Sequence, residues 1–487
     1  MIFIYLFIAL YFLAMLFIFL FSLAQAHLLI HFFLYRKKTV PRHHSAMEDL
    51  PLVTVQLPIY NERYVVERLL EAVAALNYPP AKLEIQVLDD STDKTQELIL
   101  RKIKEFPDLN FNYLHRTERS GFKAGALREG LAHAIGEFVA VFDADFVPDP
   151  DFLRDTLPFF SDPHIGMVQS RWTHLNRDYS ILTRLQALAL DAHFLVEQVG
   201  RNRQQAFINF NGTGGIWRAR CIREAGNWQD DTLTEDLDLS YRAQQQGWHF
   251  VYRPEIHSPA ELPPVMSAIK SQQYRWTKGG AECAVKHLKN VWEKPMPFRV
   301  KAHAVAHLLN SLVFIAIFLA AVSSVPLWWA YQREMVDPSL FRVGVVFLLG
   351  FAVIASVYIV AYFYGKKKSA GNLLGLIWQL PLFLAVSMGL SLHNSRAVWQ
   401  GLRGKRTSFV RTPKFNLENK SNFWANNRYI SRDIPLITFV EGGLFVFFLL
   451  VAANTVYHGT YAFLPFHLLL AIGYGMVFFT TYRSYRL

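Results

Sequence analysis

The chain has 487 residues, of which 52% are hydrophobic and only 18% are charged, so it is too apolar for an ordinary soluble protein. Its net charge of +11 would suit a nucleic-acid-binding protein, but we find no motif for binding RNA or DNA and expect no nucleic-acid partner. The basic residues cluster instead beside apolar segments, at 36–42, 366–368 and 483–486. This is the positive-inside pattern, in which Lys and Arg flank membrane helices on the cytosolic side.

Several long segments contain no Asp, Glu, Lys or Arg. Because a helix of roughly 20 apolar residues crosses a bilayer, we predict an integral, multi-pass membrane protein. The first segment is too long for the hydrophobic part of a signal peptide, and no basic residues precede it, so we predict a retained anchor. The uncharged segments are residues 1–35, 304–332, 343–365, 369–395 and 442–482.

These segments divide the chain into three parts. We predict an N-terminal transmembrane helix at 1–35, a cytosolic domain at 36–295 and a membrane domain at 296–487. The distribution of Lys and Arg predicts five spans, with the N-terminus outside and the C-terminus inside, in the plasma (inner) membrane if the chain is bacterial. The spans of the membrane domain are expected at about 304–332, 343–365, 434–457 and 460–482.

The segment 369–395 is expected not to cross. The following residues, 396–433, carry nine Lys and Arg against two acids, so the charge bias keeps them inside. Glycines and Pro381 also interrupt the segment. We therefore predict an interfacial or re-entrant helix at 369–395. The alternative is six spans, with the basic loop outside.

Between residues 51 and 290 the pattern becomes that of an α/β domain. The stretches "LVTVQLP" (52–58), "EIQVLDDSTD" (84–93) and "EFVAVFDADFVP" (137–148) read as strands, with a helix at 93–106. This alternation predicts a Rossmann-like, mostly parallel sheet whose ligands bind beyond the carboxyl ends of the strands. No GxGxxG after a strand and no GxxxxGK[ST] is present, so bound phosphates would need a metal and side chains.

Two pairs of acids follow predicted strands. Asp143 and Asp145 stand at i and i+2, where carboxylates on one face suit Mg²⁺ or Mn²⁺; the alternative is a solvated turn. Asp89 and Asp90 could belong to the same edge. Their alternative is helix capping within "DDSTD", which accounts for one acid of the pair but not for both.

The stretch "DDTLTEDLDLSYRA" (230–243) holds the third acidic group. Thr232 and Glu235 have capping-box spacing, and Asp238 and Arg242 stand at i and i+4. Asp236 has no such local partner, which makes it a candidate general base. The sequence shows neither its reach to a substrate nor its pKa.

A helix is expected at "SQQYRWTKGG" (271–280). Gln272 and Arg275 would share one face, where Arg275 could pair with a diphosphate and Trp276 could stack on a sugar ring. The alternative is an amphipathic helix that lies on the membrane surface.

The order of the motifs resembles a known family. "LPIYNE", "VLDDSTD", "KAGAL", "DAD", "TED" and "QQYRW" occur in sequence, before the membrane segments. They look like the processive inverting glycosyltransferases of family 2, the cellulose synthase and hyaluronan synthase superfamily. "QSRWTHLN" (169–176), "DAHFLVEQ" (191–198), "FNGTGGIWR" (210–218) and "EDLDLSYRAQQQGW" (235–248) resemble the cellulose synthase-like A group of mannan and glucomannan synthases. "FVRTPK" (409–414), within 405–420, is similar to the family's gating loop.

The resemblance implies a GT-A fold for the cytosolic domain and a role for each matching residue. Asp236 would be the catalytic base, and Asp143 and Asp145 would bind the metal, Mg²⁺ or Mn²⁺. Acceptor-binding residues would be Glu235, Trp276, Asn211 and Gly212. Nucleotide-sugar-binding residues would be Tyr60, Glu62, Asp89, Asp90, Lys123, Asp143, Gln272, Arg275 and Lys414.

The implied activity is that of a hexosyltransferase. It would polymerise sugar from GDP-mannose or UDP-glucose into a β-1,4-type polysaccharide and pass the growing glycan across the bilayer. One alternative is a transferase that adds a single sugar to a ceramide-type lipid. A catalytically dead transporter or scaffold is a third possibility, for which the sequence holds no supporting feature.

Overall fold

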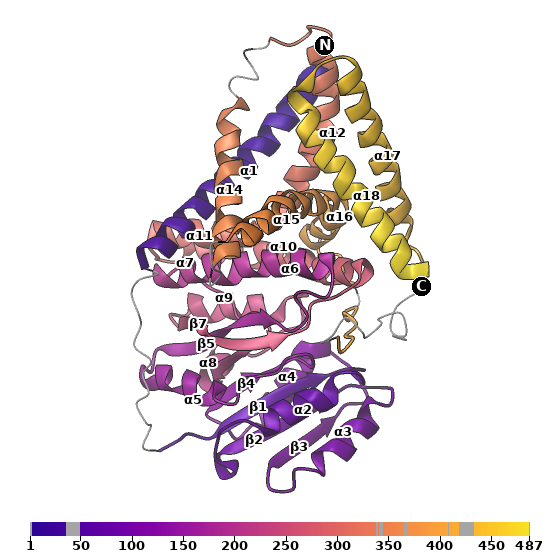
Figure 1. Ribbon diagram of the computed structural model, residues 1–487. Helices are drawn as coiled ribbons and strands as arrows, with labels where there is room; N and C mark the ends of the chain where they lie inside the picture. The colour runs from indigo at the N-terminus through magenta and orange to yellow at the C-terminus, as the bar shows by residue number, and fades with distance from the viewer. Residues whose placement is uncertain are drawn as a thin grey trace.

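The computed structural model describes residues 2–35, 49–337, 339, 344–364, 369–407, 409–417 and 433–486. An α/β domain forms one end of the molecule, and long apolar helices extend from it (Figure 1). The basic runs at 36–42 and 366–368, and residues 408 and 418–420 of the predicted gating loop, lie outside the described residues.

The α/β domain is built on one seven-stranded sheet in the order β3-β2-β1-β4-β6-β5-β7. Neighbouring strands are parallel except for β6, which runs antiparallel to β4 and β5. The predicted mostly parallel sheet is therefore confirmed. The strands are β1 (Val53–Ile59), β2 (Leu83–Asp89), β3 (Asn110–His115), β4 (Phe138–Val141), β5 (Ile165–His174), β6 (Gly215–Arg218) and β7 (His249–Ala260).

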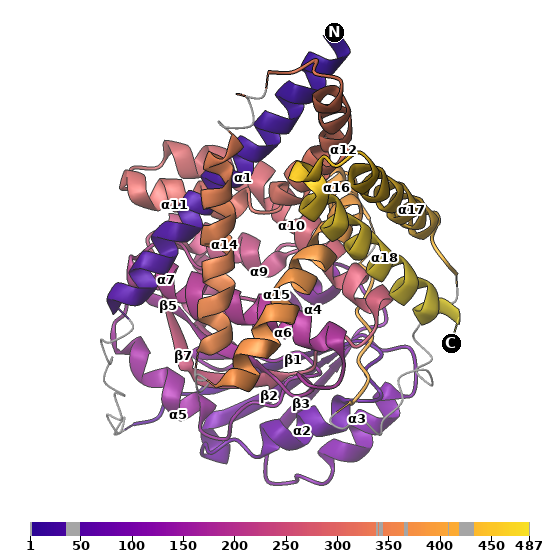
Figure 2. The same cartoon turned by 45° about the horizontal axis from the view of Figure 1, so that its top comes forward.

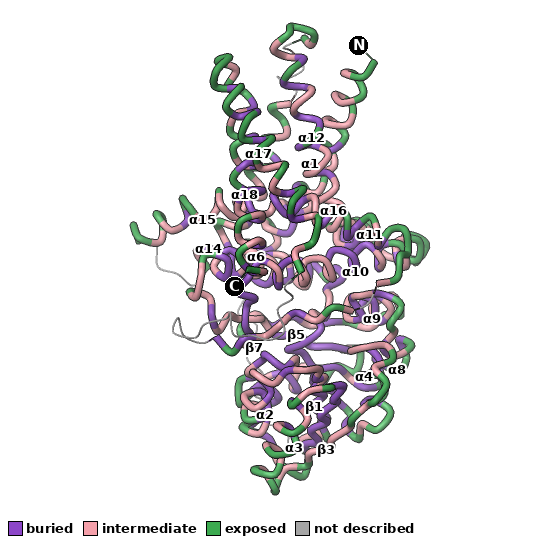
Figure 3. The backbone as a smooth tube through the Cα atoms, turned by 90° about the vertical axis from the view of Figure 1, so that its right-hand side faces the viewer, coloured by how far each residue is buried: buried purple, intermediate pink, exposed green. Residues whose placement is uncertain are grey.

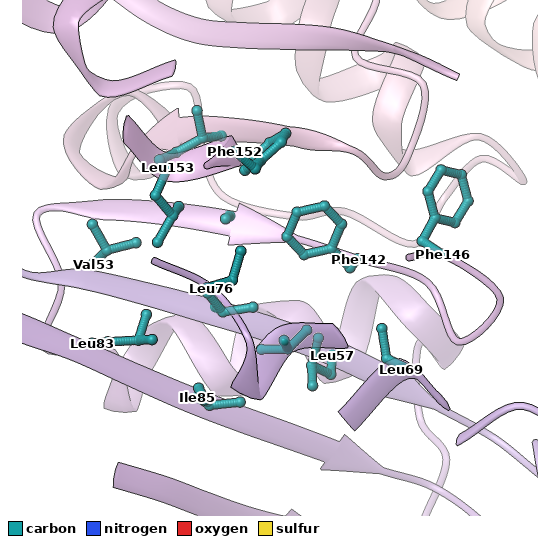
Figure 4. Close-up of a cluster of buried hydrophobic side chains, with 14 of the residues drawn as sticks. Val53, Leu57, Leu69, Leu76, Leu83, Ile85, Phe142, Phe146, Phe152 and Leu153 are labelled. Atoms are coloured by element: carbon teal, nitrogen blue, oxygen red, sulfur yellow. The ribbon is translucent and has the colours of Figure 1, made fainter. Parts of the chain in front are cut away.

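Apolar side chains cover both faces of the central strands, as expected for a sheet that has helices on each side. On one face, Leu57 and Ile85 pack against Leu69 of α2 (Val66–Ala74) and Phe152 of α5 (Phe152–Thr156) (Figure 4). On the other face, the packing is dominated by Trp217 and other aromatic residues. This rigid core fixes where each strand ends, and so where the acids that follow the strands are placed.

The remaining helices of this half surround the sheet. They are α3 (Thr95–Ile103), α4 (Phe122–His133), α6 (Ile181–Ala192), the π-helical turn η3 (His193–Glu197), α7 (Gln198–Arg203), α8 (Ala219–Glu224), α9 (Glu235–Gln245), α10 (Met266–Glu293) and α11 (Phe298–Leu308).

Six helices in the described part of the chain are long and apolar enough to cross a membrane. In Figure 3, exposed residues gather on the long helices that project from the α/β domain, which suits contact with lipid. The helices of this half are α1 (Ile2–Tyr35), α12 (Leu312–Gln332), α14 (Val346–Phe363), α15 (Ala370–Gly389), the shorter α16 (Ser391–Leu402), α17 (Leu436–Tyr457) and α18 (Leu464–Arg486).

The predicted span at 304–332 is wrong at its start. Residues 298–308 form the separate helix α11, and α12 begins only at Leu312. At the break, Leu312 N donates to Leu309 O and Val313 N to Asn310 O, which are tight i→i−3 bonds. Uniform apolar composition could not reveal this break, because both helices are uncharged over the predicted segment.

Helix α15 is one of the six candidates by length, yet it lies crosswise to α17 and α18, beside the α/β domain (Figures 1 and 2). It leads into α16, which packs on α10: Tyr274 Oη donates to Gln400 Oε1 at 2.5 Å, and His393 Nε2 lies 3.0 Å from Lys270 O. Both ends of the crosswise helix thus remain near the α/β domain. The interfacial helix stays a prediction, supported by this orientation.

Helix α10 is also fixed to α17, by an ion pair with an acidic residue inside that apolar helix. Lys270 of α10 and Glu441 of α17 are both buried and form an ion pair of 2.7 Å. A charged side chain in such a helix is expected to face the protein interior and to have a partner, as Glu441 does. The helix that carries "QQYRW" is thereby fixed between the sheet and the membrane helices.

Candidate active site

A pocket opens at the carboxyl end of the sheet, between the strand ends, α9, α10 and residues 409–414. All of the sequence-predicted site residues except Asp89 line it. Those that do are Tyr60, Glu62, Asp90, Lys123, Asp143, Asp145, Asn211, Gly212, Glu235, Asp236, Gln272, Arg275, Trp276 and Lys414. They come from segments more than 350 residues apart, and the sheet topology alone brings the strand ends together.

Asp89 lies behind the pocket and not on its wall. It is fully buried, and its carboxylate accepts hydrogen bonds from Tyr113 Oη at 2.8 Å and Ser91 N at 2.9 Å. Asp90 does reach the pocket, where Arg116 binds both of its oxygens at 2.7 and 2.6 Å. Helix α3 begins later, at Thr95, so neither acid caps it.

Asp143 and Asp145 follow β4 and face the pocket in a turn. Lys123 Nζ lies 2.6 Å from Asp143 Oδ1, and Lys414 Nζ lies 2.7 Å from Asp145 Oδ2. The alternative of a solvated turn fails for Asp145, which is only 1% exposed. Its Oδ1 is buried and has no hydrogen-bond partner among the described residues.

This pair of carboxylates fits a divalent cation. A buried carboxylate oxygen that lacks a partner is a suitable ligand, and hard cations prefer oxygen. Among the described residues, no group of three or more His, Cys, Asp or Glu could hold a metal alone. Two carboxylates would therefore need further oxygens from a substrate, as is common where Mg²⁺ binds with phosphates.

Helix α9 places Glu235 and Asp236 at the pocket. The predicted capping box is wrong: the N-cap is Thr234, and it makes no side-chain cap bond. Glu235 instead turns toward Lys123, with 3.8 Å between its Oε1 and Nζ. The predicted Asp238–Arg242 pair is confirmed at 2.8 Å, and the buried Asp238 also contacts His287 Nε2 at 2.8 Å.

Burial, and next the neighbouring Glu235, raise the pKa of Asp236 to about 7, although Lys123 opposes both effects. Burial likewise raises the pKa of Glu235. Leu237 N donates to Asp236 Oδ1 at 2.8 Å, which fixes the carboxylate. A carboxylate with a pKa near neutrality suits general-base catalysis, which is the property that the sequence alone could not show.

Gly212 closes the wall beside Asp236. Its carbonyl oxygen accepts a hydrogen bond from Lys123 Nζ at 2.8 Å. Its φ is +82°, and an added Cβ would lie 3.1 Å from Asp236 Oδ2. A side chain at this position would be strained and would crowd the carboxylate.

Helix α10 contributes Gln272, Arg275 and Trp276 from one face. Arg275 Nη2 donates to Thr412 Oγ1 at 2.7 Å, and its guanidinium lies 4.6 Å from the centre of the Phe409 ring. The other alternative was an amphipathic helix that lies on the membrane surface; in the structure α10 packs against α16 through Tyr274 and Lys270.

Residues 409–417 cover the pocket, and Figure 1 shows them as an orange segment that runs from α16 toward the sheet. Besides the Lys414–Asp145 pair, Arg411 Nη1 lies 2.8 Å from Glu62 Oε1 and donates to Tyr60 O at 3.1 Å. Burial raises the pKa of Glu62 to about 7 even though Arg411 opposes that shift. The segment with gating-loop similarity therefore does lie over the site.

Sequence reasoning missed several pocket residues, and three of them carry charged or aromatic side chains that contact other residues of the site. Phe409 and Arg411 lie within the "FVRTPK" stretch, from which only Lys414 was assigned a role. The third is Arg119, whose guanidinium stacks 3.5 Å from the centre of the Tyr60 ring. Phe409 and Arg411 could have been predicted, because they share a short stretch with Lys414, which was assigned to the site. No local sequence pattern distinguishes Arg119.

Comparisons with known proteins agree with this geometry. Residues 51–279 match the family model described as glycosyltransferase like family 2. Probable glucomannan 4-beta-mannosyltransferase 4 of Oryza sativa subsp. japonica is 41% identical over 300 residues, which cover 57% of this chain and 55% of that protein. Glucomannan 4-beta-mannosyltransferase 7 of Arabidopsis thaliana is 38% identical over 330 residues, with coverages of 62% and 59%. The chain thus spans a little over half the length of the curated relatives it matches.

A solved structure shares the fold. The mannosyltransferase PcManGT from Pyrobaculum calidifontis, in complex with GDP-Man and Mn²⁺, superposes with a TM-score of 0.54 at 21% sequence identity. The match covers 80% of this chain and 100% of that one. The predicted GT-A architecture, joined to apolar helices, is thereby confirmed.

Proposed function

We propose that the protein is a membrane-bound, inverting β-glycosyltransferase that elongates a polysaccharide, because residues 51–279 match the model of glycosyltransferase like family 2. The observation that carries the proposal is the convergence of Asp236, the Asp143–Asp145 pair and Arg275 on one pocket. These groups supply a base, a cation site and a positive charge for a leaving group.

In the proposed reaction, the acceptor hydroxyl oxygen attacks the anomeric carbon of the donor sugar while the bond from that carbon to the diphosphate oxygen breaks. The hydroxyl proton passes to the Asp236 carboxylate, and the nucleoside diphosphate leaves with the bonding electrons. Lys123 and Arg275 place positive charge where negative charge develops on the diphosphate. A divalent cation held by Asp143 and Asp145, Mg²⁺ or Mn²⁺, would neutralise more of that charge.

GDP-mannose is the donor that we propose. The curated relatives at about 40% identity are named glucomannan 4-beta-mannosyltransferases, and the structural neighbour was solved with GDP-Man. The product would be a β-1,4-linked mannan or glucomannan. Its growing end would stay at the pocket, and the older part of the polymer would leave on the side of α10 and α16, where the membrane helices begin.

A donor panel on the purified protein tests this proposal. The full chain in detergent, with Mg²⁺ or Mn²⁺, is supplied with GDP-mannose, GDP-glucose and UDP-glucose, and the products are sized and their linkages determined. A ladder of β-1,4-linked mannosides is expected. One sugar on each lipid would instead identify the lipid transferase, and no turnover of any donor would favour a scaffold.

The rate of transfer is expected to rise with pH through about 7. The reason is that Asp236 accepts a proton only as a carboxylate, and its raised pKa keeps it protonated below that value. The check is kcat/KM measured with saturating cation between pH 5 and 9. A profile that is flat from pH 5 to 7 would contradict the role of Asp236.

We also propose five crossings, with the pocket on the cytosolic side and the basic loop on that same side. Support comes from Arg411 and Lys414 of that loop, which form ion pairs with Glu62 and Asp145 of the α/β domain. A cysteine at the exposed Lys405 should react with an impermeant maleimide only from the cytosolic face, and one at the exposed Tyr457 only from outside. The two native cysteines are buried and give little background. Labelling of both positions from one face would overturn this topology.

A further inference from the structure

The motif "DAHFLVEQ" has no role in the reaction described so far, although its backbone is unusual. Residues His193–Glu197 form the π-helical turn η3 between α6 and α7. Such turns are rare and often occur at functional sites, because the extra residue changes which side chains face a neighbour. Here His193 and Glu197 lie one above the other, with 3.2 Å between Nδ1 and Oε2.

His193 reaches the wall of the pocket through Asn211. Its Nε2 lies 3.1 Å from Asn211 Oδ1, which also accepts a hydrogen bond from Asn209 Nδ2 at 2.8 Å. The carbonyl end of the Asn211 amide therefore lies between the Asn209 amide, which donates to it, and the His193 ring. Its other end, Nδ2, has no hydrogen-bond partner among the described residues, although Asn211 lines the pocket next to Gly212.

Glu197 is itself held from two directions. Gln25 Nε2 of α1 donates to Glu197 Oε1 at 2.9 Å, and Arg201 Nη2 lies 3.3 Å from Oε2. Burial alone would raise the pKa of Glu197, but Arg201 and His193 lower it to about 2. The charged Glu197 carboxylate is thereby held beside His193 and fixes the orientation of its ring.

These contacts form one line from a membrane helix to the site, in the order Gln25, Glu197, His193 and Asn211. Asn211 precedes Gly212, which stands against the Asp236 carboxylate. Asn211 lines the pocket beside the proposed base, so its unpaired amide donor lies at the wall of the space that an acceptor hydroxyl must enter. A buried donor that stays unpaired is unfavourable, so a ligand that pairs with it gains affinity.

We propose that His193 is a positioning residue for the acceptor: it orients the Asn211 amide so that Nδ2 donates a hydrogen bond to a hydroxyl of the acceptor sugar. This inference rests on the proposed transferase function. In this proposal Asn211 contacts the acceptor sugar. His193 and Glu197 keep the Asn211 amide in a fixed position relative to the Asp236 carboxylate.

The test separates acceptor binding from donor chemistry. The purified full chain is assayed with GDP-mannose and short β-1,4-mannoside acceptors, and hydrolysis of GDP-mannose by water is measured in parallel. His193→Ala is expected to raise the acceptor KM by about 10- to 100-fold, in line with the loss of one oriented hydrogen bond. The rate of donor hydrolysis and the donor Kd should stay within about twofold.

Two further variants guard against a merely structural effect. His193→Gln keeps a donor near Asn211 Oδ1 and should recover part of the acceptor affinity. His303→Ala disturbs packing against α1, where the His303 Nε2 lies 2.8 Å from His27 Nδ1, but it does not touch Asn211. This variant should leave the acceptor KM unchanged.

A double variant tests whether His193 acts through Asn211. His193→Ala/Asn211→Ala should be no weaker in acceptor binding than Asn211→Ala alone.

The proposal is overturned if His193→Ala lowers hydrolysis and transfer by the same factor, or leaves the acceptor KM unchanged. It is also overturned if the two substitutions add in full. Failure of the proposed function looks different, because the native chain would then turn over no nucleotide sugar, or would add one sugar to a lipid and not elongate the mannoside.

Discussion

Asp236→Asn is expected to lower the rate of sugar transfer by about 10²–10⁴-fold, the usual contribution of a general base. Asparagine has the same shape and can still accept the hydrogen bond from Leu237 N, so the fold of α9 should persist. It cannot take a proton from the acceptor. Donor affinity should change little, because the groups proposed to bind the diphosphate are untouched.

The measurement pairs single-turnover transfer with calorimetric binding of the donor. Asp231→Asn is the matched control, because Asp231 precedes the same helix and is exposed, with Lys286 as its partner at 2.8 Å. Its activity should match that of the native chain. If Asp236→Asn transferred sugar at more than about a tenth of the native rate, Asp236 would not be the general base. Glu235 would then be the candidate for that role.

Asp145→Asn is expected to lower kcat/KM by at least about 10²-fold, since cation-assisted stabilisation of a leaving diphosphate is worth several kcal/mol. The substitution replaces the buried carboxylate whose Oδ1 has no hydrogen-bond partner among the described residues. The dependence of donor binding on Mg²⁺ or Mn²⁺ should weaken in parallel. Titration of each cation at fixed donor concentration checks this.

Two controls separate the cation site from the covering segment. Asp149→Asn alters an exposed acid in the same loop and should behave as native. Lys414→Met removes the partner of Asp145 from residues 409–417 and should weaken closure over the donor while the cation dependence remains. If Asp145→Asn kept the native response to cation, Asp145 would not be a ligand.

Three strands, β1, β2 and β4, were predictable from the sequence. β4 appears as a buried apolar run and β1 as an alternating stretch, and parallel pairing then brings the acids after them to one edge. Asp236 could be identified as a candidate because its neighbours had local partners and it did not. Its raised pKa could not be foreseen, since it arises from burial and from Glu235 in the folded chain.

Other features depend on contacts that no local pattern encodes. Arg411 donates to the carbonyl of Tyr60, 351 residues away, and His193 meets Asn211 through a turn whose π-helical backbone leaves no mark in the sequence. The same limit explains two errors. Thr232 and Glu235 have capping-box spacing, but the helix starts after Thr234, and an apolar run hid the break between α11 and α12.

Lys123 and Lys414, which contact the two acids, affect how metal and donor bind to the site. Asp143 and Asp145 already have ammonium counterions, Lys123 and Lys414, so the four side chains together are close to electrically neutral. A free dication approaching them is attracted only weakly. A nucleoside diphosphate brings the missing negative charge and gives both lysines new partners. Metal and donor should therefore enter as a preformed complex, and the cellular supply of chelated nucleotide sugar, more than that of free ion, would set the occupancy of the enzyme.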